Sequence, residues 1–153
     1  LGEEFPIYFA INALALGAAS MINAKLVMIY GMRYLSMRAM GSFCVIAVAF
    51  LPVVLAYDGV PPLWAFMAFC MSSFFCVSIL FGNLNAMAME PMGKIAGMAA
   101  ALIGSASTLI SLPIGVATGQ LFDGTLLPMV ASFAVIAAAA FALLYRTSKI
   151  SEE

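Results

Sequence analysis

The chain contains no histidine and very little charge. Only six basic and seven acidic residues occur among its 153 residues, and none of them falls inside a long apolar run. The missing histidine removes the commonest general base, and no two carboxylates are spaced for acid–base chemistry. With 65% hydrophobic and 8% charged residues, the chain also has too little polar surface for a water-soluble domain. The composition therefore excludes a soluble fold, and we expect no enzyme activity.

Cysteine is scarce as well. Cys44, Cys70 and Cys76 all lie inside apolar runs and lack the spacing of metal ligands. We interpret them as small apolar residues, and we expect neither a metal nor another cofactor. No segment has the pattern of a phosphate-binding loop, and no nucleic-acid partner is expected.

Long apolar runs are what the chain has instead. Five uncharged stretches reach the roughly 17 to 25 residues that cross a bilayer as a helix, at about 5–22, 39–57, 63–80, 95–119 and 126–145. They are continuous rather than alternating, unlike the strands of a membrane barrel. The sequence therefore predicts an all-α membrane protein, with about five transmembrane helices in a single domain over residues 1–153.

The basic residues fall in alternate gaps between these runs. Lys25, Arg33 and Arg38 follow the first run, Lys94 follows the third, and Arg146 and Lys149 follow the fifth. The other gaps and the N-terminal end hold Glu3, Glu4, Asp58 and Asp123 and no lysine or arginine. By the positive-inside rule, we expect the N-terminus outside and the C-terminus in the cytoplasm. The chain opens with Leu1 and has no basic leader, so we expect a piece of a longer protein; a complete small protein is the alternative.

Polarity differs among the runs. The second and fifth are almost purely apolar, as expected for helices surrounded by lipid. The third carries a mildly polar stripe at helical spacing, made of Phe69, Ser72, Cys76, Ile79 and Asn83. Asn12 adds an amide in the first run, where an unpaired amide costs free energy. A ligand contact and an interhelical hydrogen bond are both open interpretations of these amides.

The fourth run is rich in small and hydroxyl side chains. Its hydroxyls are Ser105, Ser107, Thr108, Ser111 and Thr118. Gly93 and Gly97, and again Gly115 and Gly119, are separated by three residues, which predicts close helix packing. Pro113 predicts a bend that would act as a hinge. No run contains a titratable carboxylate, so any proton coupling would need groups outside these runs.

One stretch resembles a known family. Residues 81–104 read FGNLNAMAMEPMGKIAGMAAALIG, which resembles the segment between the tenth and eleventh helices of major facilitator superfamily transporters, in particular the Bcr/CflA group of drug-resistance antiporters. Residues 23–27 with Gly31 and Arg33 resemble that group's cytoplasmic loop between helices eight and nine, and residues 119–125 also fit. The five runs would then be helices eight to twelve, most of the C-terminal half-bundle.

The resemblance implies proton-coupled multidrug efflux by alternating access, in a multi-pass protein of the bacterial inner membrane. The implied partners are membrane lipid, the preceding helices of the same transporter, a small hydrophobic or drug-like substrate, and protons. The cavity would be lined by Phe69, Ser72, Cys76 and Asn83, then Asn12 and Ser107. Lys25, Gly31 and Arg33 would lie in a cytoplasmic loop.

The chain departs from the family pattern at one place. The family's loop signature has an aspartate and an arginine shortly before the glycine, whereas alignment on Gly31 puts Met28 and Ile29 there. The charge network that stabilises one gating state is therefore not expected on this side. The alternative function is a non-transporting membrane subunit or truncated remnant that only packs against partner helices.

Overall fold

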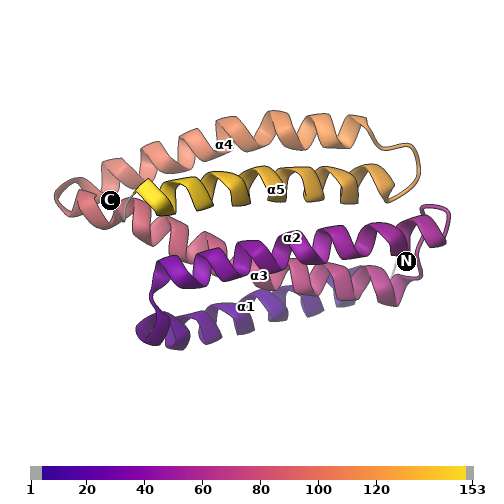
Figure 1. The fold of residues 1–153 in the computed structure, drawn as a ribbon, viewed down its shortest axis with the longest axis horizontal. Helices are drawn as coiled ribbons and strands as arrows, with labels where there is room; N and C mark the ends of the chain where they lie inside the picture. The colour runs from indigo at the N-terminus through magenta and orange to yellow at the C-terminus, as the bar shows by residue number, and fades with distance from the viewer. Residues whose placement is uncertain (1–4, 151–153) are drawn as a thin grey trace.

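The computed structural model describes residues 5–150, and every regular element among them is helical (Figure 1). The long helices are α1 (Phe5–Tyr30), α2 (Met32–Ala56), α3 (Leu63–Met89), α4 (Ala96–Gln120) and α5 (Leu127–Ile150). A short 3-10 segment, η1 (Glu90–Ile95), joins α3 to α4. The all-α part of the sequence prediction is confirmed for the described chain.

Four described segments are long and apolar enough to cross a membrane: Pro6–Tyr30, Met32–Ala56, Leu63–Gln120 and Leu127–Thr147. The third is 58 residues long and contains α3, η1 and α4. A straight helix of that length would extend about 87 Å at about 1.5 Å per residue, against a hydrocarbon core of about 30 Å. The chain instead reverses at η1, where Met92 leaves helical geometry (φ −110°, ψ 21°), and α4 runs back antiparallel to α3 (Figure 1). The protein is a multi-pass membrane protein.

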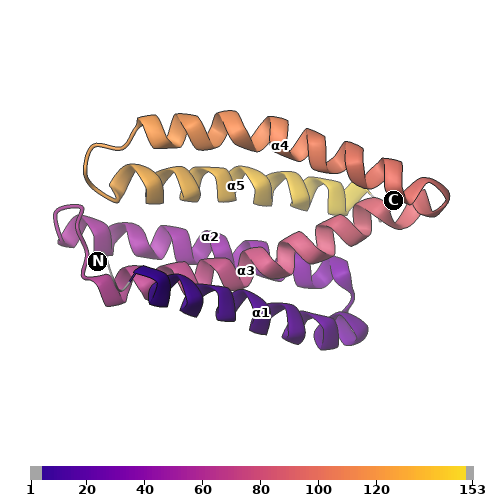
Figure 2. The ribbon, with the colours of Figure 1, turned by 180° about the vertical axis from the view of Figure 1, so that it is seen from behind.

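Basic and acidic residues lie at opposite ends of the bundle. Because successive helices alternate in direction, the α1–α2 junction, η1 and the end of α5 lie at one end (Figures 1 and 2). These segments carry Lys25, Arg33, Arg38, Lys94 and Arg146, together with Glu90. The turns at the other end carry Asp58 and Asp123. We call these the basic end and the acidic end.

Helix α2 is packed on two sides. It lies between α3 and α5, and α1 packs against α3. Its buried residues are Leu35, Ser36, Ala39, Met40, Ala47, Phe50 and Val54. Phe50 stacks on Phe69 of α3, with ring centroids 4.4 Å apart and planes 10° apart. The expectation that this run is surrounded by lipid is wrong, because a helix that is apolar on every face can pack against two neighbours at once.

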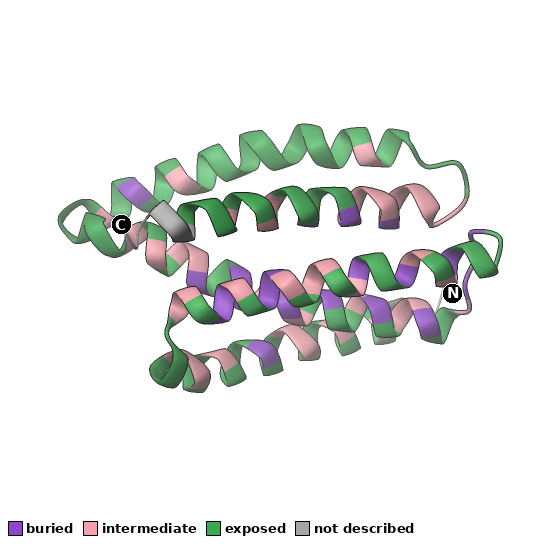
Figure 3. Cartoon of the chain, in the orientation of Figure 1, coloured by how far each residue is buried: buried purple, intermediate pink, exposed green. Residues whose placement is uncertain are grey.

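Helix α4 is the opposite case. Ala99 is the one residue of α4 that is buried, and Figure 3 shows the helix exposed over almost its whole length. The chain exposes 10100 Å² in all, whereas a compact soluble protein of its 16.1 kDa mass would expose about 7,400 Å². Much of this surface is therefore left for lipid or for further helices.

The segment predicted to be a cytoplasmic loop is helical, which corrects the prediction for Lys25 and Arg33. Lys25 lies in α1 and Arg33 in α2, and the break between the helices is a single residue, Gly31. Gly31 has φ +79°, a conformation that residues with a side chain rarely adopt. Hydropathy marks only the part of a helix that lies in lipid, whereas backbone hydrogen bonds continue the helix beyond it.

Two turns meet at the acidic end. The Leu126 N–H donates to the Gly59 carbonyl oxygen at 2.8 Å, and Gly59 has φ +86°. A Cβ added to Gly59 would lie 2.5 Å from Thr125 Cβ, so the two turns touch without a gap. Asp123 accepts hydrogen bonds from the Thr125 hydroxyl at 2.7 Å and from its N–H at 2.9 Å, and these lower the pKa of Asp123.

Candidate functional site

Two of the predicted cavity residues, Phe69 and Ser72, line one groove between α2 and α3. The groove has a volume of about 340 Å³, and Trp64 borders it toward the acidic end. Phe69 is 4% exposed because its ring is stacked on Phe50. The Ser72 hydroxyl is exposed and donates to the Ala68 carbonyl oxygen at 2.8 Å, so its lone pairs remain available to an incoming donor.

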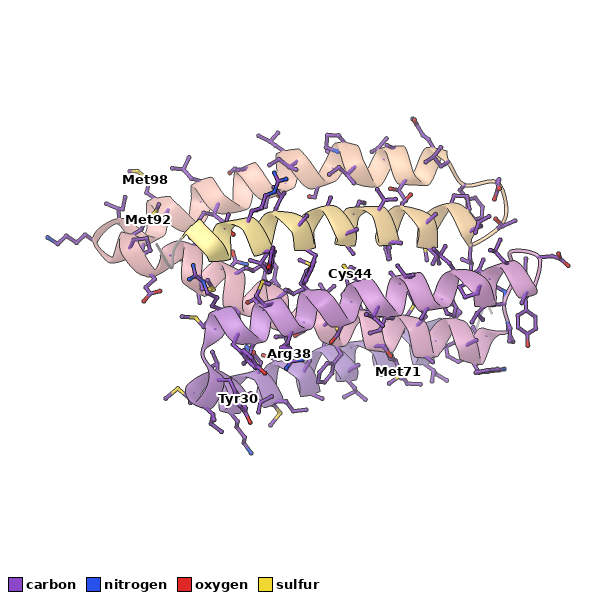
Figure 4. The ribbon with its side chains drawn as sticks, viewed as in Figure 1. Tyr30, Arg38, Cys44, Met71, Met92 and Met98 are labelled. Atoms are coloured by element: carbon purple, nitrogen blue, oxygen red, sulfur yellow. The ribbon has the colours of Figure 1, made fainter. Side chains whose placement is uncertain are left out.

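Cys76 joins Ser72 in an adjoining recess of about 350 Å³, which also contacts Ala15 of α1 and Ile46 of α2. Met71, labelled in Figure 4, forms part of the same wall. Both hollows on α3 are near the lower limit of small-molecule sites, about 300 Å³. The fold thus brings together three of the six predicted cavity residues.

Asn83 does not line a described cavity. Its Nδ2 donates to Asn23 Oδ1 at 2.9 Å, and Asn23 Nδ2 donates to Asn83 Oδ1 at 2.8 Å. Asn83 is 3% exposed, so this reciprocal pair satisfies a buried amide and ties α1 to α3. Of the two interpretations left open by the sequence, the interhelical hydrogen bond is the one observed. Asn23 lies outside the apolar runs, so the sequence does not single it out as a partner of Asn83.

Only one of the two polar atoms in the Asn12 side chain has a hydrogen-bond partner. Its Nδ2 donates to the Tyr8 carbonyl oxygen at 3.0 Å and lies 3.9 Å from Met67 Sδ, but its buried Oδ1 has no hydrogen-bond partner. A groove of about 550 Å³ between α1 and α3 is lined beside it by Tyr8, Met67 and Trp64. Ser73, which the sequence did not single out, also has a buried side-chain oxygen that lacks a partner among the described residues.

The groove between α4 and α5, which we call the α4–α5 groove, has a volume of about 650 Å³. Its α4 wall is formed by Ser111, Ile114, Gly115, Thr118 and Gly119, and Phe122, Met129, Phe133 and Ile136 complete it. The apolar wall on α5 was not predicted, since α5 reads as uniformly apolar. The signal was present, because Met129, Phe133 and Ile136 follow helical i, i+4, i+7 spacing on one face.

Ser107 lies one turn before Ser111 on the same face of α4 and is exposed. The neighbouring hydroxyls of Ser105 and Thr108 donate to carbonyl oxygens of their own helix, at 2.7 Å and 2.9 Å. Such internal hydrogen bonds lower the cost of placing a hydroxyl in lipid. The exposed hydroxyls of Ser105 and Thr108 are therefore tolerated in lipid without a hydrogen bond to another helix.

The glycines of α4 and η1 are not points of close helix approach. A Cβ built on Gly93, Gly97, Gly115 or Gly119 would meet no atom within 4 Å, so the predicted tight packing is not found among the described residues. The physical reason is that α4 stands away from its neighbours. Pro113 lies inside α4, and the helix continues through it; its role as a hinge stays a prediction.

Nucleophiles and metal ligands are dispersed in the part of the chain that is described. Residues 5–150 hold no group of three or more His, Cys, Asp or Glu that could bind a metal ion. Cys44, Cys70 and Cys76 are free thiols. The chemistry available in the grooves is thus apolar contact supplemented by a few hydroxyl oxygens.

Comparison with known proteins adds no relative to this picture. No protein-family model, no curated protein and no solved structure matches the chain. The geometry of the grooves and the resemblance of residues 81–104 are therefore the features that bear on function.

Proposed function

We propose that this chain is part of a membrane transporter of the major facilitator type, which exports small hydrophobic compounds by alternating access. The observation that carries the proposal is the α4–α5 groove. Its volume of about 650 Å³ lies within the range of small-molecule sites, about 300–1,000 Å³. Aromatic, methionine and aliphatic side chains with two hydroxyls suit a varied set of apolar ligands.

The uncovered surface of α4 supports the same proposal. Alternating access needs a second bundle that rocks against the first around a shared site. In the described chain α4 has only one buried residue, so it offers a face to such a bundle. The coupling carboxylate would belong to that bundle, because helices α1 to α5 contain none within residues 5–150.

A second candidate is a membrane subunit that packs against partner helices and transports nothing. The specific observation in its favour is the open glycine face of α4, where four glycines have free space around them. Small residues of this kind let a helix from another subunit approach closely. Both candidates use the same surface, and transport distinguishes them.

The test is extrusion of a hydrophobic fluorescent cation, driven by a proton gradient, from cells that lack their main efflux pumps. The gene product is expressed in full, once as it stands and once with Gly115→Leu. The substitution places a large side chain on the wall of the groove, at a position where an added Cβ meets nothing within 4 Å. We expect the initial extrusion rate to fall about tenfold, as when about 1.4 kcal/mol of binding is lost.

The matched control is Gly17→Leu. Gly17 also lies within a long helix with nothing within 4 Å, but it lines none of the grooves described above. Its extrusion rate should equal that of the parent at equal expression. If the parent is abundant and inserted yet extrudes nothing, the transport proposal fails and the packing subunit takes its place. If both variants extrude normally, the α4–α5 groove is not on the transport path.

A further inference from the structure

A different groove lies between the first half of α2 and the second half of α5, and we call it the α2–α5 groove. Its volume is about 570 Å³. Met37, Val45 and Ile46 of α2 and Phe141 of α5 form its apolar walls. Gly41 lies among them, and a Cβ there would come within 3.6 Å of Phe141 Cε2. The absence of a side chain at Gly41 therefore keeps the middle of the groove open.

An arginine and a tyrosine stand where this groove reaches the basic end. Arg38 and Tyr34 belong to its lining, and Figure 4 shows Arg38 toward the same end of the molecule as Tyr30. Arg38 Nε donates to the Tyr34 hydroxyl at 3.1 Å, and its Cζ lies 5.3 Å from the centre of the Tyr34 ring. These contacts hold the guanidinium at the groove through Nε, and its two terminal nitrogens carry further N–H donors.

No carboxylate of the described chain forms an ion pair with Arg38. The end of the bundle around it is strongly basic, with five described basic side chains against Glu90 alone. Because α2 and α5 are antiparallel and Gly41 faces Phe141, Arg146 is level with the first turns of α2. A bound anion would complement this excess of positive charge.

The position of the groove relative to the membrane follows from the sequence. The uncharged run of α2 begins directly after Arg38. The ring pairs Tyr30–Tyr34 and Phe141–Tyr145 flank this level, with centroids 5.7 Å and 6.4 Å apart, and such aromatic side chains favour the interface between headgroups and hydrocarbon. From Arg38 to Ile46 the helix rises about 12 Å, close to the roughly 15 Å depth of hydrocarbon in one leaflet.

We propose that the α2–α5 groove is a binding site for an anionic phospholipid. The lipid phosphate binds the terminal nitrogens of Arg38, which match two phosphate oxygens at once. One acyl chain lies along Gly41, Val45 and Phe141 toward the middle of the membrane. The site requires only that the protein is embedded in a membrane, so it holds whether or not the chain transports.

The experiment is native mass spectrometry and thermal unfolding of the purified full chain in detergent. Dioleoyl phosphatidylglycerol is compared with dioleoyl phosphatidylcholine, which has the same acyl chains without the net charge, and with inorganic phosphate, which has no acyl chain. We expect one tightly bound phosphatidylglycerol, with a dissociation constant about tenfold below that of phosphatidylcholine. Inorganic phosphate should neither raise the unfolding temperature nor displace the lipid.

Three variants locate the site. Arg38→Gln should weaken phosphatidylglycerol binding about tenfold, and Val45→Trp should do the same by filling the groove from an exposed position, at which Val45 is 67% exposed. Arg33→Gln is the matched control, because Arg33 is a basic residue of the same helix that does not line the groove. Each variant is accepted only with the helicity of the parent by circular dichroism.

Several outcomes would overturn the proposal. Equal weakening by Arg33→Gln and Arg38→Gln would mean diffuse attraction by the basic end. Equal binding of the two lipids would remove the role of charge, and competition by inorganic phosphate would mean a site for a free anion. Unchanged lipid binding in Val45→Trp would place the acyl chain elsewhere.

Discussion

Helices α2 and α4 have the same length and each contains a proline, but they differ in how many of their residues are buried. Each has 25 residues and an internal proline, Pro52 in α2 and Pro113 in α4. Yet α2 buries seven residues between α3 and α5, while α4 buries one. The helix with fewer hydroxyls and glycines is the better packed of the two. In a membrane, then, side-chain polarity alone does not tell which helix occupies the centre of a bundle.

The physical reason is that lipid is as apolar as a leucine side chain, so burial between helices gains little from the hydrophobic effect. Packing in lipid depends instead on how well the side chains of neighbouring helices fit together, and on which helices the connecting turns place side by side. Helix α2 is held by aromatic stacking and by close-fitting Val54 and Val130, both fully buried. Helix α4 satisfies the hydroxyls of Ser105 and Thr108 through its own carbonyl oxygens and can remain exposed.

The largest expected effect tests whether α2 is the structural centre. Phe50→Ala should lower the free energy of unfolding by about 3 kcal/mol, because it leaves a cavity beside Phe69. Leu109→Ala on α4 should change it by less than about 0.5 kcal/mol, since Leu109 is 73% exposed. Both are measured by circular dichroism during titration of detergent micelles with sodium dodecyl sulfate. Equal losses would show that α4 is packed as firmly as α2.

How much of this contrast the sequence could predict depends on the element. The helices were predictable because each contains a continuous uncharged run, but their ends were not. The chain from 23 to 30 stays helical since it contains no proline or glycine. Ser72 and Cys76 could be grouped from their spacing within one helix. The pairing of Asn83 with Asn23 could not, because the partners are 60 residues apart.

The second effect concerns the contact that holds the α4–α5 loop against the end of α2. Gly59→Ala should cost about 2 kcal/mol of unfolding free energy, because an alanine is strained at φ +86° and its Cβ would overlap Thr125. Gly124→Ala is the matched control, since Gly124 has φ +92° but nothing within 4 Å. It should cost about 1 kcal/mol, the backbone part alone. If the two glycines give equal losses in the same titration, the Gly59–Thr125 contact is not formed in micelles.

The smallest expected effect concerns the Asn23–Asn83 hydrogen bonds, which join α1 to α3. They contrast with the α4 hydroxyls that donate to carbonyl oxygens of their own helix. Asn23→Leu and Asn83→Leu should each destabilise the protein, since each leaves the partner amide, buried at Asn83 and half-buried at Asn23, without these hydrogen bonds. The double variant should lose less than the sum of the two, with a coupling energy of about 0.6–1.7 kcal/mol. Ser105→Ala removes a hydroxyl bonded only to its own helix and should be neutral. Strict additivity of the two asparagine variants would mean that α1 and α3 are not joined by this pair, and the contrast with α4 would then rest on apolar packing alone.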